Sequence, residues 1–205
     1  MIAIDGPAGS GKSTVARALA ERLGWAFLDT GAMYRAVTWA ALDRSLDVAD
    51  APAVARLADT LVITTRPLVT VDGRDVTDEI RTDQVNVAVS VVAANPDVRA
   101  SMVARQRQWA ADEEVGTVVE GRDITTVVFP AATLKVFLTA SAEERARRRG
   151  DESASSVARR DEADTTREAS PLRQADDALV VDTTGREVPD VVEEIMGCLA
   201  SRHLS

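Results

Sequence analysis

The residues near the start of the chain have the types and the spacing of a phosphate-binding loop. The stretch Gly6-Pro7-Ala8-Gly9-Ser10-Gly11-Lys12-Ser13-Thr14 fits the pattern G-x-x-x-x-G-K-[ST]. Its glycines allow the backbone to bend around a polyphosphate and to point successive N–H groups at it. Lys12 is then expected to reach the β- and γ-phosphates, and the hydroxyl of Ser13 is expected to bind Mg²⁺. The pattern predicts a site for a nucleoside triphosphate.

The elements on either side of this loop are the ones needed to hold it. The apolar residues 2–4 are typical of a short buried strand, and residues 15–23 form a helical pattern that ends at Gly24. The loop would therefore lie at a helix N-terminus, whose dipole favours anions. A glycine-rich turn without a ligand is the alternative, and the strand–loop–helix context argues against it.

Short apolar runs alternate with helical patterns along the rest of the chain. Strands are predicted at 2–4, 25–29, 115–120, 134–138 and 178–181, and a helix is predicted from an N-cap at Thr30 to about Leu42. This alternation predicts an α/β fold: a P-loop, three-layer arrangement with a five-stranded parallel sheet covered on both faces. Ligands bind such sheets at the carboxyl ends of the strands, so Arg35 and Arg122 are expected at the same edge as the phosphate-binding loop.

Two stretches interrupt the alternation. Residues 61–80 contain β-type runs around the turn Asp72-Gly73, a pattern that predicts a small antiparallel meander. Helices are predicted after it at 85–94 and 96–111. We interpret 61–108 as an inserted lobe within a single domain, 1–205. Residues 145–168 are polar and rich in arginine, which is typical of a lid over a phosphate site.

Composition excludes several classes of function. The net charge of −9 over 205 residues argues against a nucleic-acid-binding surface, and no apolar run approaches the length of a membrane span. Cys198 is the only cysteine, so neither an internal disulfide nor a cysteine-based metal site is expected. The only histidine, His203, lies next to the chain end, which argues against histidine-based catalysis. We expect a cytoplasmic monomer that does not bind membranes.

Arginines at predicted strand ends and in the lid indicate what the second substrate is. The guanidinium groups of Arg35, Arg122, Arg160 and Arg167 could each grip a phosphate through two hydrogen bonds. A phosphate monoester is already dianionic at neutral pH and needs no general base, which fits the lack of a histidine in the predicted cleft. The Asn-Lys-x-Asp element of guanine-reading switch proteins is absent. A phosphate acceptor is therefore favoured over an alcohol.

Further motifs resemble those of bacterial cytidylate kinases, in the nucleoside-monophosphate kinase group. They follow the family's order over nearly the whole chain and are Ile4 to Thr14, Leu28 to Arg35, Val119 to Ile124, Thr126 to Pro130, Phe137 to Ser141, Arg160-Asp161, Asp164, Arg167, Ser170 to Leu172 and Val181 to Thr184. The most specific are Asp-Thr-Gly-Ala-Met-Tyr-Arg and Gly-Arg-Asp-Ile. The resemblance implies phosphoryl transfer from ATP, with Mg²⁺, to CMP and dCMP, and it implies that 61–108 is a CMP-binding lobe.

The resemblance also implies a role for individual residues. Residues 6–14 would bind ATP, with Lys12 among the catalytic residues. The phosphate of CMP would be held by Arg35, Arg122 and Arg167, its cytosine by Ser90, Arg99 and Asp123, and its ribose by Arg160 and Asp164. A carboxylate suits cytosine because it can accept a hydrogen bond from the N4 amine, which uracil lacks. An N-cap role for Asp123 and a packing role for Ser90 are the structural alternatives.

Two departures from the family pattern keep other functions open. Thr125 stands where the family usually has glycine, and its Cβ is expected to strain a backbone that needs a positive φ. The lid is short, with only residues 150–158 between Arg149 and Arg159. The alternatives are a kinase for another small acceptor, such as shikimate, and a nucleotide-sensing protein without turnover.

Overall fold

The structure is a computed structural model that describes residues 1–148, 165–166 and 171–203. It divides the chain into two units, one made of Met1–Leu28 with Glu113–Ser205 and the other of Asp29–Asp112. Residues 61–108, the predicted inserted lobe, lie inside the second unit, which begins earlier, at Asp29. None of the described helices combines the length and hydrophobicity that crossing a membrane requires.

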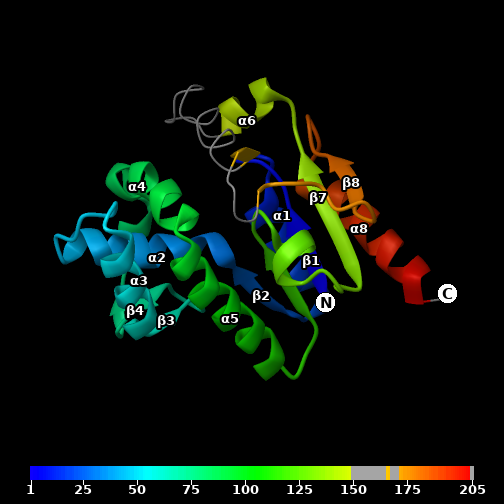
Figure 1. Cartoon of the computed structure of the whole chain (residues 1–205). Helices are drawn as coiled ribbons and strands as arrows, with labels where there is room; N and C mark the ends of the chain where they lie inside the picture. Colours follow the sequence, from blue (N-terminus) through cyan, green and yellow to red (C-terminus); the bar gives the residue numbers. More distant parts are fainter. Residues whose placement is uncertain (149–164, 167–170, 204–205) are drawn as a thin grey trace. The chain divides into compact units, whose positions relative to one another are not determined.

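The first unit is built on the predicted five-stranded parallel sheet (Figure 1). Its strands are β1 (Ile2–Asp5), β2 (Ala26–Asp29), β6 (Thr117–Glu120), β7 (Leu134–Thr139) and β8 (Leu179–Asp182). They lie in the order β2-β6-β1-β7-β8, so β1 is central and pairs in parallel with both β6 and β7. All five predicted strands are confirmed. The phosphate-binding loop therefore leaves the middle of the sheet.

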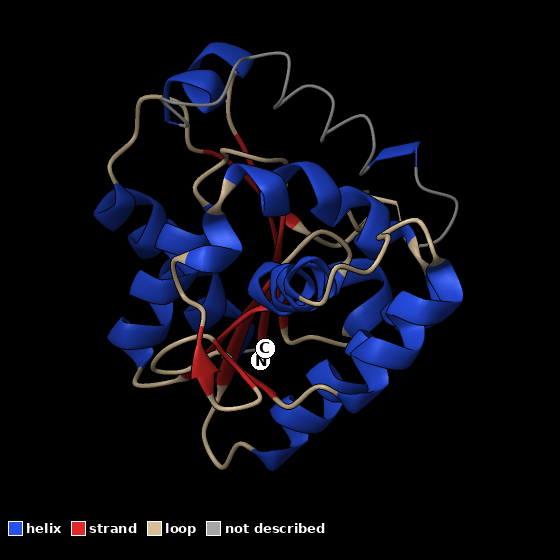
Figure 2. Cartoon of the chain, turned by 90° about the vertical axis from the view of Figure 1, so that its left-hand side faces the viewer, coloured by secondary structure: helices blue, strands red, loops and turns tan. Residues whose placement is uncertain are grey.

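Helices α1 (Lys12–Leu23) and α8 (Val188–His203) cover one face of this sheet. Their apolar side chains and those of the strands form the hydrophobic core of the first unit. Leu19 of α1 and Ile195 of α8 are fully buried together with Ile2 and Ile4 of β1. Burying a side chain of this size stabilises the fold by about 1.5–3 kcal/mol relative to leaving it exposed. The first unit also contains α6 (Ala142–Arg148) and a π-helical turn, η2 (Ile124–Val128). Figure 2 shows the helices of the chain in blue and its strands in red.

The second unit is mainly helical and contains the predicted meander. Its elements are α2 (Thr30–Asp43), α3 (Ala51–Thr60), β3 (Ile63–Thr64), β4 (Thr70–Val71), β5 (Arg74–Asp75), the 3₁₀ turn η1 (Glu79–Arg81), α4 (Asp83–Ala94) and α5 (Pro96–Asp112). The three short strands are antiparallel, and the β4–β5 turn places Asp72 and Gly73 at φ values of 50° and 83°. Helix α2 packs against α4, and α3 packs against α5.

The N-cap of α2 differs from the prediction. Asp29, and not Thr30, caps the helix, because its Oδ1 accepts a hydrogen bond of 2.9 Å from the backbone N–H of Ala32. Aspartate and threonine are both good caps, and they stand next to each other in the sequence. Thr30 instead becomes the first residue of the helix and is buried.

Candidate functional site

The phosphate-binding loop joins β1 directly to α1, as the sequence predicts. Gly11 precedes the helix with a φ of 87°, and Gly6 leaves the strand with a φ of 152°, both of which disfavour other residues. A Cβ on Gly6 would also collide with the backbone carbonyl oxygen of Leu138. Glycine at these two positions therefore lets the loop turn tightly at the carboxyl end of β1.

Lys12 and Ser13 lie at the start of α1 with their polar atoms held by the first unit. The Nζ of Lys12 donates to the carbonyl oxygen of Pro7 at 2.8 Å, and the Oγ of Ser13 donates to Oε1 of Glu120 at 2.7 Å. Glu120 is the last residue of β6, so a hydroxyl and a carboxylate from neighbouring segments meet at the strand ends. Oxygen groups of this kind are what Mg²⁺ prefers.

A magnesium site of this type needs few protein ligands. No cluster of three or more histidine, cysteine, aspartate or glutamate residues suited to a metal occurs in the part of the chain that the structure describes. Mg²⁺ usually keeps several waters and is held by one or two protein groups together with substrate phosphates. The donor pair Ser13–Glu120 fits such a site.

Arg122 and Asp123 follow β6, and Arg122 contacts the first residue of the phosphate-binding loop. The backbone N–H of Gly121 donates to the carbonyl oxygen of Ile4, and Nη1 of Arg122 donates to that of Gly6 at 2.6 Å. Asp123 is buried and precedes the turn η2, but its carboxylate makes no capping hydrogen bond to it. The structure thus brings Arg122 to the phosphate-binding loop. It does not give Asp123 the capping role that was its structural alternative.

The strain predicted at Thr125 is absent, so that prediction is wrong. The only described non-glycine residues with positive φ are Ser45 and Asp72. Thr125 is instead a fully buried member of the π-helical turn η2. Its backbone N–H and its hydroxyl both donate to Oδ2 of Asp5, at 2.7 and 2.6 Å. Burial raises the pKa of Asp5, and these hydrogen bonds together with one from Ile124 oppose the rise.

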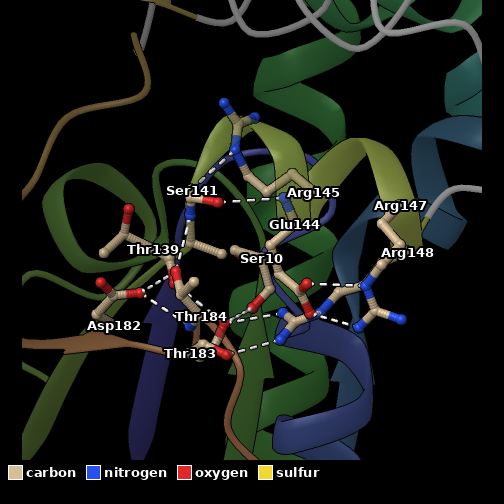
Figure 3. Close-up of polar contacts among 11 residues, drawn as sticks. Ser10, Thr139, Ser141, Glu144, Arg145, Arg147, Arg148, Asp182, Thr183 and Thr184 are labelled. Carbon is tan, nitrogen blue, oxygen red and sulfur yellow. Dashed lines mark hydrogen bonds and ion pairs between the residues drawn. The ribbon is translucent and has the colours of Figure 1, made fainter.

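A polar network connects α6 to the loop that follows β8 (Figure 3). The guanidinium of Arg148 donates to Oγ1 of Thr183 at 2.8 Å and to its carbonyl oxygen at 2.7 Å, and its Nε donates to Oε1 of Glu144 at 2.8 Å. The hydroxyl of Thr183 in turn donates to the backbone carbonyl oxygen of Ser10 at 3.0 Å. Hydrogen bonds from Arg147 and then Arg148 lower the pKa of Glu144 to about 2. The phosphate-binding loop is thereby tied to α6.

A pocket of about 280 Å³ lies beside this network. It is lined by Ser10, Gly11, Thr14, Val15, Glu144, Arg147, Arg148, Thr183, Gly185, Arg186, Glu187, Val188 and Val191. A lining that combines apolar valines with guanidinium groups suits a planar, partly apolar ring next to a charged group. The contact between Arg148 and Thr183 could not be predicted from the sequence, because no local spacing relates α6 to the loop after β8.

The predicted site residues of the second unit lie on three helices. Arg35 of α2 donates through Nη1 to Oδ1 of Asn86 on α4 at 2.6 Å and to the carbonyl oxygen of Ile80 at 3.0 Å. Ser90 is half-buried one helical turn after Asn86, which places it on the same face of α4. Arg99 of α5 is buried, and its guanidinium carbon lies 5.6 Å from the centre of the Tyr34 ring, within the range of a cation–π contact.

The remaining predicted residues, Arg160, Asp164 and Arg167, lie outside the described residues, as does most of the predicted lid, 145–168. Their assignment to the ribose and phosphate of CMP stays a prediction. Within the described part of this segment, Arg145 contacts the phosphate-binding loop by donating through Nη1 to the carbonyl oxygen of Ala8 at 3.2 Å.

Comparisons with known proteins identify the family of this chain. Residues 2–201 match the family model described as cytidylate kinase. The chain is 49% identical to a cytidylate kinase of Geobacillus kaustophilus, with 98% of this chain and 96% of that protein covered. It is 46% identical to a cytidylate kinase of Bacillus subtilis, with 95% and 94% covered.

Solved structures support the fold. A shikimate kinase from Acinetobacter baumannii matches with a TM-score of 0.53 over 100% of this chain and 94% of that one, at 16% identity. An identity this low carries the fold alone and says nothing about the acceptor. The match of the family model over nearly the whole length and the two close relatives decide the family: this chain belongs to the cytidylate kinases.

Proposed function

We propose that this protein transfers the γ-phosphoryl group of ATP to CMP, giving ADP and CDP, and that dCMP is a second acceptor. The observation that carries the proposal is the position of Arg122 against the phosphate-binding loop, with the buried carboxylate of Asp123 next in sequence, in a chain of this family. Arg122, which could bind the phosphate of CMP, contacts the predicted ATP site, and Asp123, which could accept a hydrogen bond from the cytosine amine, is the next residue. A kinase that phosphorylates CMP needs both.

The residues of the first unit would bind the donor. Backbone N–H groups of residues 6–14 and the Nζ of Lys12 would hold the β- and γ-phosphates. The ammonium of Lys12 carries three N–H donors, so it could contact phosphate oxygens as well as the carbonyl oxygen of Pro7. The pocket beside Ser10 and Thr183 would take the base of ATP, because it adjoins the loop and offers apolar and guanidinium surfaces. Ser13, next to Glu120, would hold Mg²⁺. When bound, this ion neutralises charge on the β- and γ-phosphates.

The acceptor would be held by arginines and needs no general base. The phosphate of CMP is largely dianionic at neutral pH, because its second pKa is about 6. One of its oxygens attacks the γ-phosphorus, the bond from that phosphorus to the β–γ bridging oxygen breaks, and ADP leaves. Arg122, with Arg35 and Arg167, would offset the repulsion between the two anions. Arginine suits this task because it remains charged and binds phosphate through two hydrogen bonds.

Asp123, with Ser90 and Arg99, would read the base. A carboxylate accepts a hydrogen bond from the N4 amine of cytosine, whereas the O4 atom of uracil would place two acceptors against each other. A buried charged hydrogen bond of this kind contributes about 1.5–3 kcal/mol, which corresponds to a preference for CMP over UMP of about 10- to 100-fold.

The experiment is an acceptor assay. We expect ADP release by the purified protein to be fast with CMP and dCMP and slow with UMP, AMP and shikimate. Asp123→Ala should lose the preference for CMP over UMP while the KM for ATP stays within about twofold. Equal wild-type rates with CMP and UMP would contradict the assignment of cytosine. A rise in the KM for ATP in Asp123→Ala would place Asp123 around the metal instead.

The same assay separates the other candidates. A nucleotide sensor would bind ATP or CMP without repeated turnover, and a kinase for another small acceptor would favour shikimate. The unstrained backbone at Thr125 removes one of the two observations that favoured the sensor. The monomeric state stays a proposal, and sedimentation of the purified protein tests it.

A further inference from the structure

The first unit contains a buried contact between the end of β1 and the turn η2 that the proposed chemistry does not use. Asp5 and Thr125 are both 0% exposed. The carboxylate of Asp5 accepts three hydrogen bonds, from the backbone N–H of Ile124 at 2.9 Å and from the N–H and the hydroxyl of Thr125 at 2.7 and 2.6 Å. Every one of these donors lies about 120 residues away in the sequence.

This contact is costly to build, and stability alone does not explain it. Removing a carboxylate from water is unfavourable, and replacing buried polar groups by well-packed apolar ones is often neutral or stabilising. The nearby charge of Asp123 adds to the cost, because it disfavours an ionised Asp5. A buried polar contact of this kind can instead fix the relative position of two segments.

The two segments that it joins are those of the proposed phosphoryl transfer. Asp5 immediately precedes Gly6 at the start of the phosphate-binding loop, and Thr125 follows Arg122 and Asp123 by two to three residues. Arg122 donates back to the carbonyl oxygen of Gly6 at 2.6 Å, so the contacts close a ring. A shift of Arg122 or Asp123 along the sheet edge would therefore strain the hydrogen bond from Arg122 to Gly6 or the buried hydrogen bonds to Asp5.

We propose that Asp5 and Thr125 are positioning residues that hold Arg122 and Asp123 at a fixed distance from the phosphate-binding loop, and so set the affinity and base preference for the acceptor. This inference rests on the proposed function. Asp5 and Thr125 act through Arg122 and Asp123 and do not contact the substrate themselves. The hydroxyl of Thr125 supplies one of the three hydrogen bonds to Asp5, which a residue without a side-chain donor could not, since it would offer only its backbone N–H.

The test uses Thr125→Val, which keeps the shape and removes the hydroxyl, and Thr125→Ser, which restores it. The matched control is Thr126→Val, because the hydroxyl of Thr126 is buried and has no hydrogen-bond partner among the described residues. We expect Thr125→Val to raise the KM for CMP about tenfold, the effect of one lost buried hydrogen bond, and to lower the preference for CMP over UMP. Thr125→Ser should recover both values, and Thr126→Val should change neither.

Two results would overturn the proposal. One is an unchanged KM for CMP and an unchanged CMP:UMP ratio in Thr125→Val. The other is a KM for ATP that rises as much as the KM for CMP, since the contact would then position the phosphate-binding loop. If Thr125→Val does not fold, Thr125→Gly removes the same hydroxyl without a buried methyl group and is interpreted in the same way.

A second measurement separates this inference from the proposed function. Amide hydrogen exchange at Ile124 and Thr125 in the ligand-free protein reports the contact itself. We expect exchange at these amides to be about tenfold faster in Thr125→Val than in Thr126→Val. If wild-type protein does not phosphorylate CMP, the proposed function fails, while this difference in exchange still measures the contact. Equal exchange in the two variants would show that the hydroxyl does not hold η2, and would overturn the inference.

Discussion

At the scale of single residues, three carboxylates of the first unit accept hydrogen bonds from three different kinds of donor. Asp5 accepts from backbone N–H groups and a hydroxyl, Glu120 accepts from the hydroxyl of Ser13, and Glu144 pairs with guanidinium groups. The environments of Asp5 and Glu144 move their pKa values in opposite directions. Burial raises the pKa of Asp5, and Arg147 and Arg148 lower that of Glu144 to about 2. The charge of a carboxylate at this site therefore depends both on its burial and on its hydrogen-bond partners.

The lowered pKa of Glu144 predicts a specific dependence of stability on pH. Because its pKa is about 2 in the folded protein and 4.5 in an unfolded chain, ionised Glu144 stabilises the folded state above pH 4.5. This contribution declines as the pH falls from about 4.5 and is lost near pH 2. We expect Glu144→Gln to be less stable than wild type at pH 7 and to approach it as the pH falls through this window.

Urea unfolding of both proteins at a series of pH values measures this difference. Arg147→Gln is the companion variant, because the hydrogen bond from Arg147 is the largest cause of the lowered pKa. In that background the effect of Glu144→Gln should be smaller at pH 7. A wild-type advantage over Glu144→Gln that stays constant between pH 7 and 3 would show that the charge of Glu144 does not stabilise the fold through its arginine partners.

At the scale of elements, the position of Arg35 depends on how helix α2 begins. Helix α2 carries Arg35 and is capped by Asp29, whose Oδ1 accepts from the N–H of Ala32 at 2.9 Å. Helix α3 is capped in the same way by Asp50, which accepts from the N–H of Ala53 at 3.0 Å, and carries none of the proposed site residues. The two caps form a natural comparison between stability and function.

We expect Asp29→Ala and Asp50→Ala each to lower the free energy of unfolding by about 1 kcal/mol, the usual cost of losing an N-cap. Only Asp29→Ala should also raise the KM for CMP, because it loosens the first turns of the helix that holds Arg35. Asp29→Asn, which can still cap, should retain both properties. Urea unfolding and acceptor kinetics on the three variants provide the measurements. A matching rise in KM in Asp50→Ala would assign the effect to general loss of stability.

The elements also show what could be predicted from the sequence. The five sheet strands and the meander were predictable because apolar runs bounded by turn residues carry a local signal. Helices α3 and α8 were not predicted, although Asp50 and Pro52 mark the start of α3. Thr125 was misjudged because its backbone conformation is set by hydrogen bonds to Asp5, about 120 residues away. Local patterns contain no information on contacts of that range.

In the candidate site, too, contiguous motifs could be predicted from the sequence and contacts between distant segments could not. The phosphate-binding loop is a contiguous motif, so its place between β1 and α1 could be predicted. The Ser13–Glu120 pair and the contact of Arg148 with Thr183 join segments that are distant in sequence. Their geometry follows from the strand order β2-β6-β1-β7-β8, which places β6 beside β1 and β8 beside β7 and which no local pattern specifies.

At the scale of the whole molecule, the proposed site residues are distributed over two units. Lys12, Ser13, Arg122 and Asp123 belong to the first unit, and Arg35, Ser90 and Arg99 belong to the second. The proposed ATP residues in the described chain are therefore confined to one unit, whereas those proposed for CMP come from both. The two nucleotides should consequently leave different footprints on the molecule.

Hydrogen exchange with each nucleotide alone provides the test of this division. We expect a non-hydrolysable ATP analogue with Mg²⁺ to slow exchange in residues 6–14 and in the loop after β8, and to leave α4 and α5 unchanged. CMP should slow exchange in α4, in α5 and in residues 121–128. At a concentration about 100 times Kd, binding stabilises the bound form by about 2.7 kcal/mol, so protection of up to about 100-fold is expected where exchange requires release of the ligand.

Two variants make the footprints specific to the residues proposed. Lys12→Ala should remove the protection by the ATP analogue and retain the protection by CMP, because its ammonium would act on phosphates of the donor alone. Arg99→Ala should do the reverse, because its guanidinium would act on the base of the acceptor. If CMP protects residues 6–14 and leaves α4 and α5 unchanged, the second unit does not bind the acceptor. The roles proposed for Arg35, Ser90 and Arg99 would then have to be withdrawn, while the ATP site in the first unit would stand.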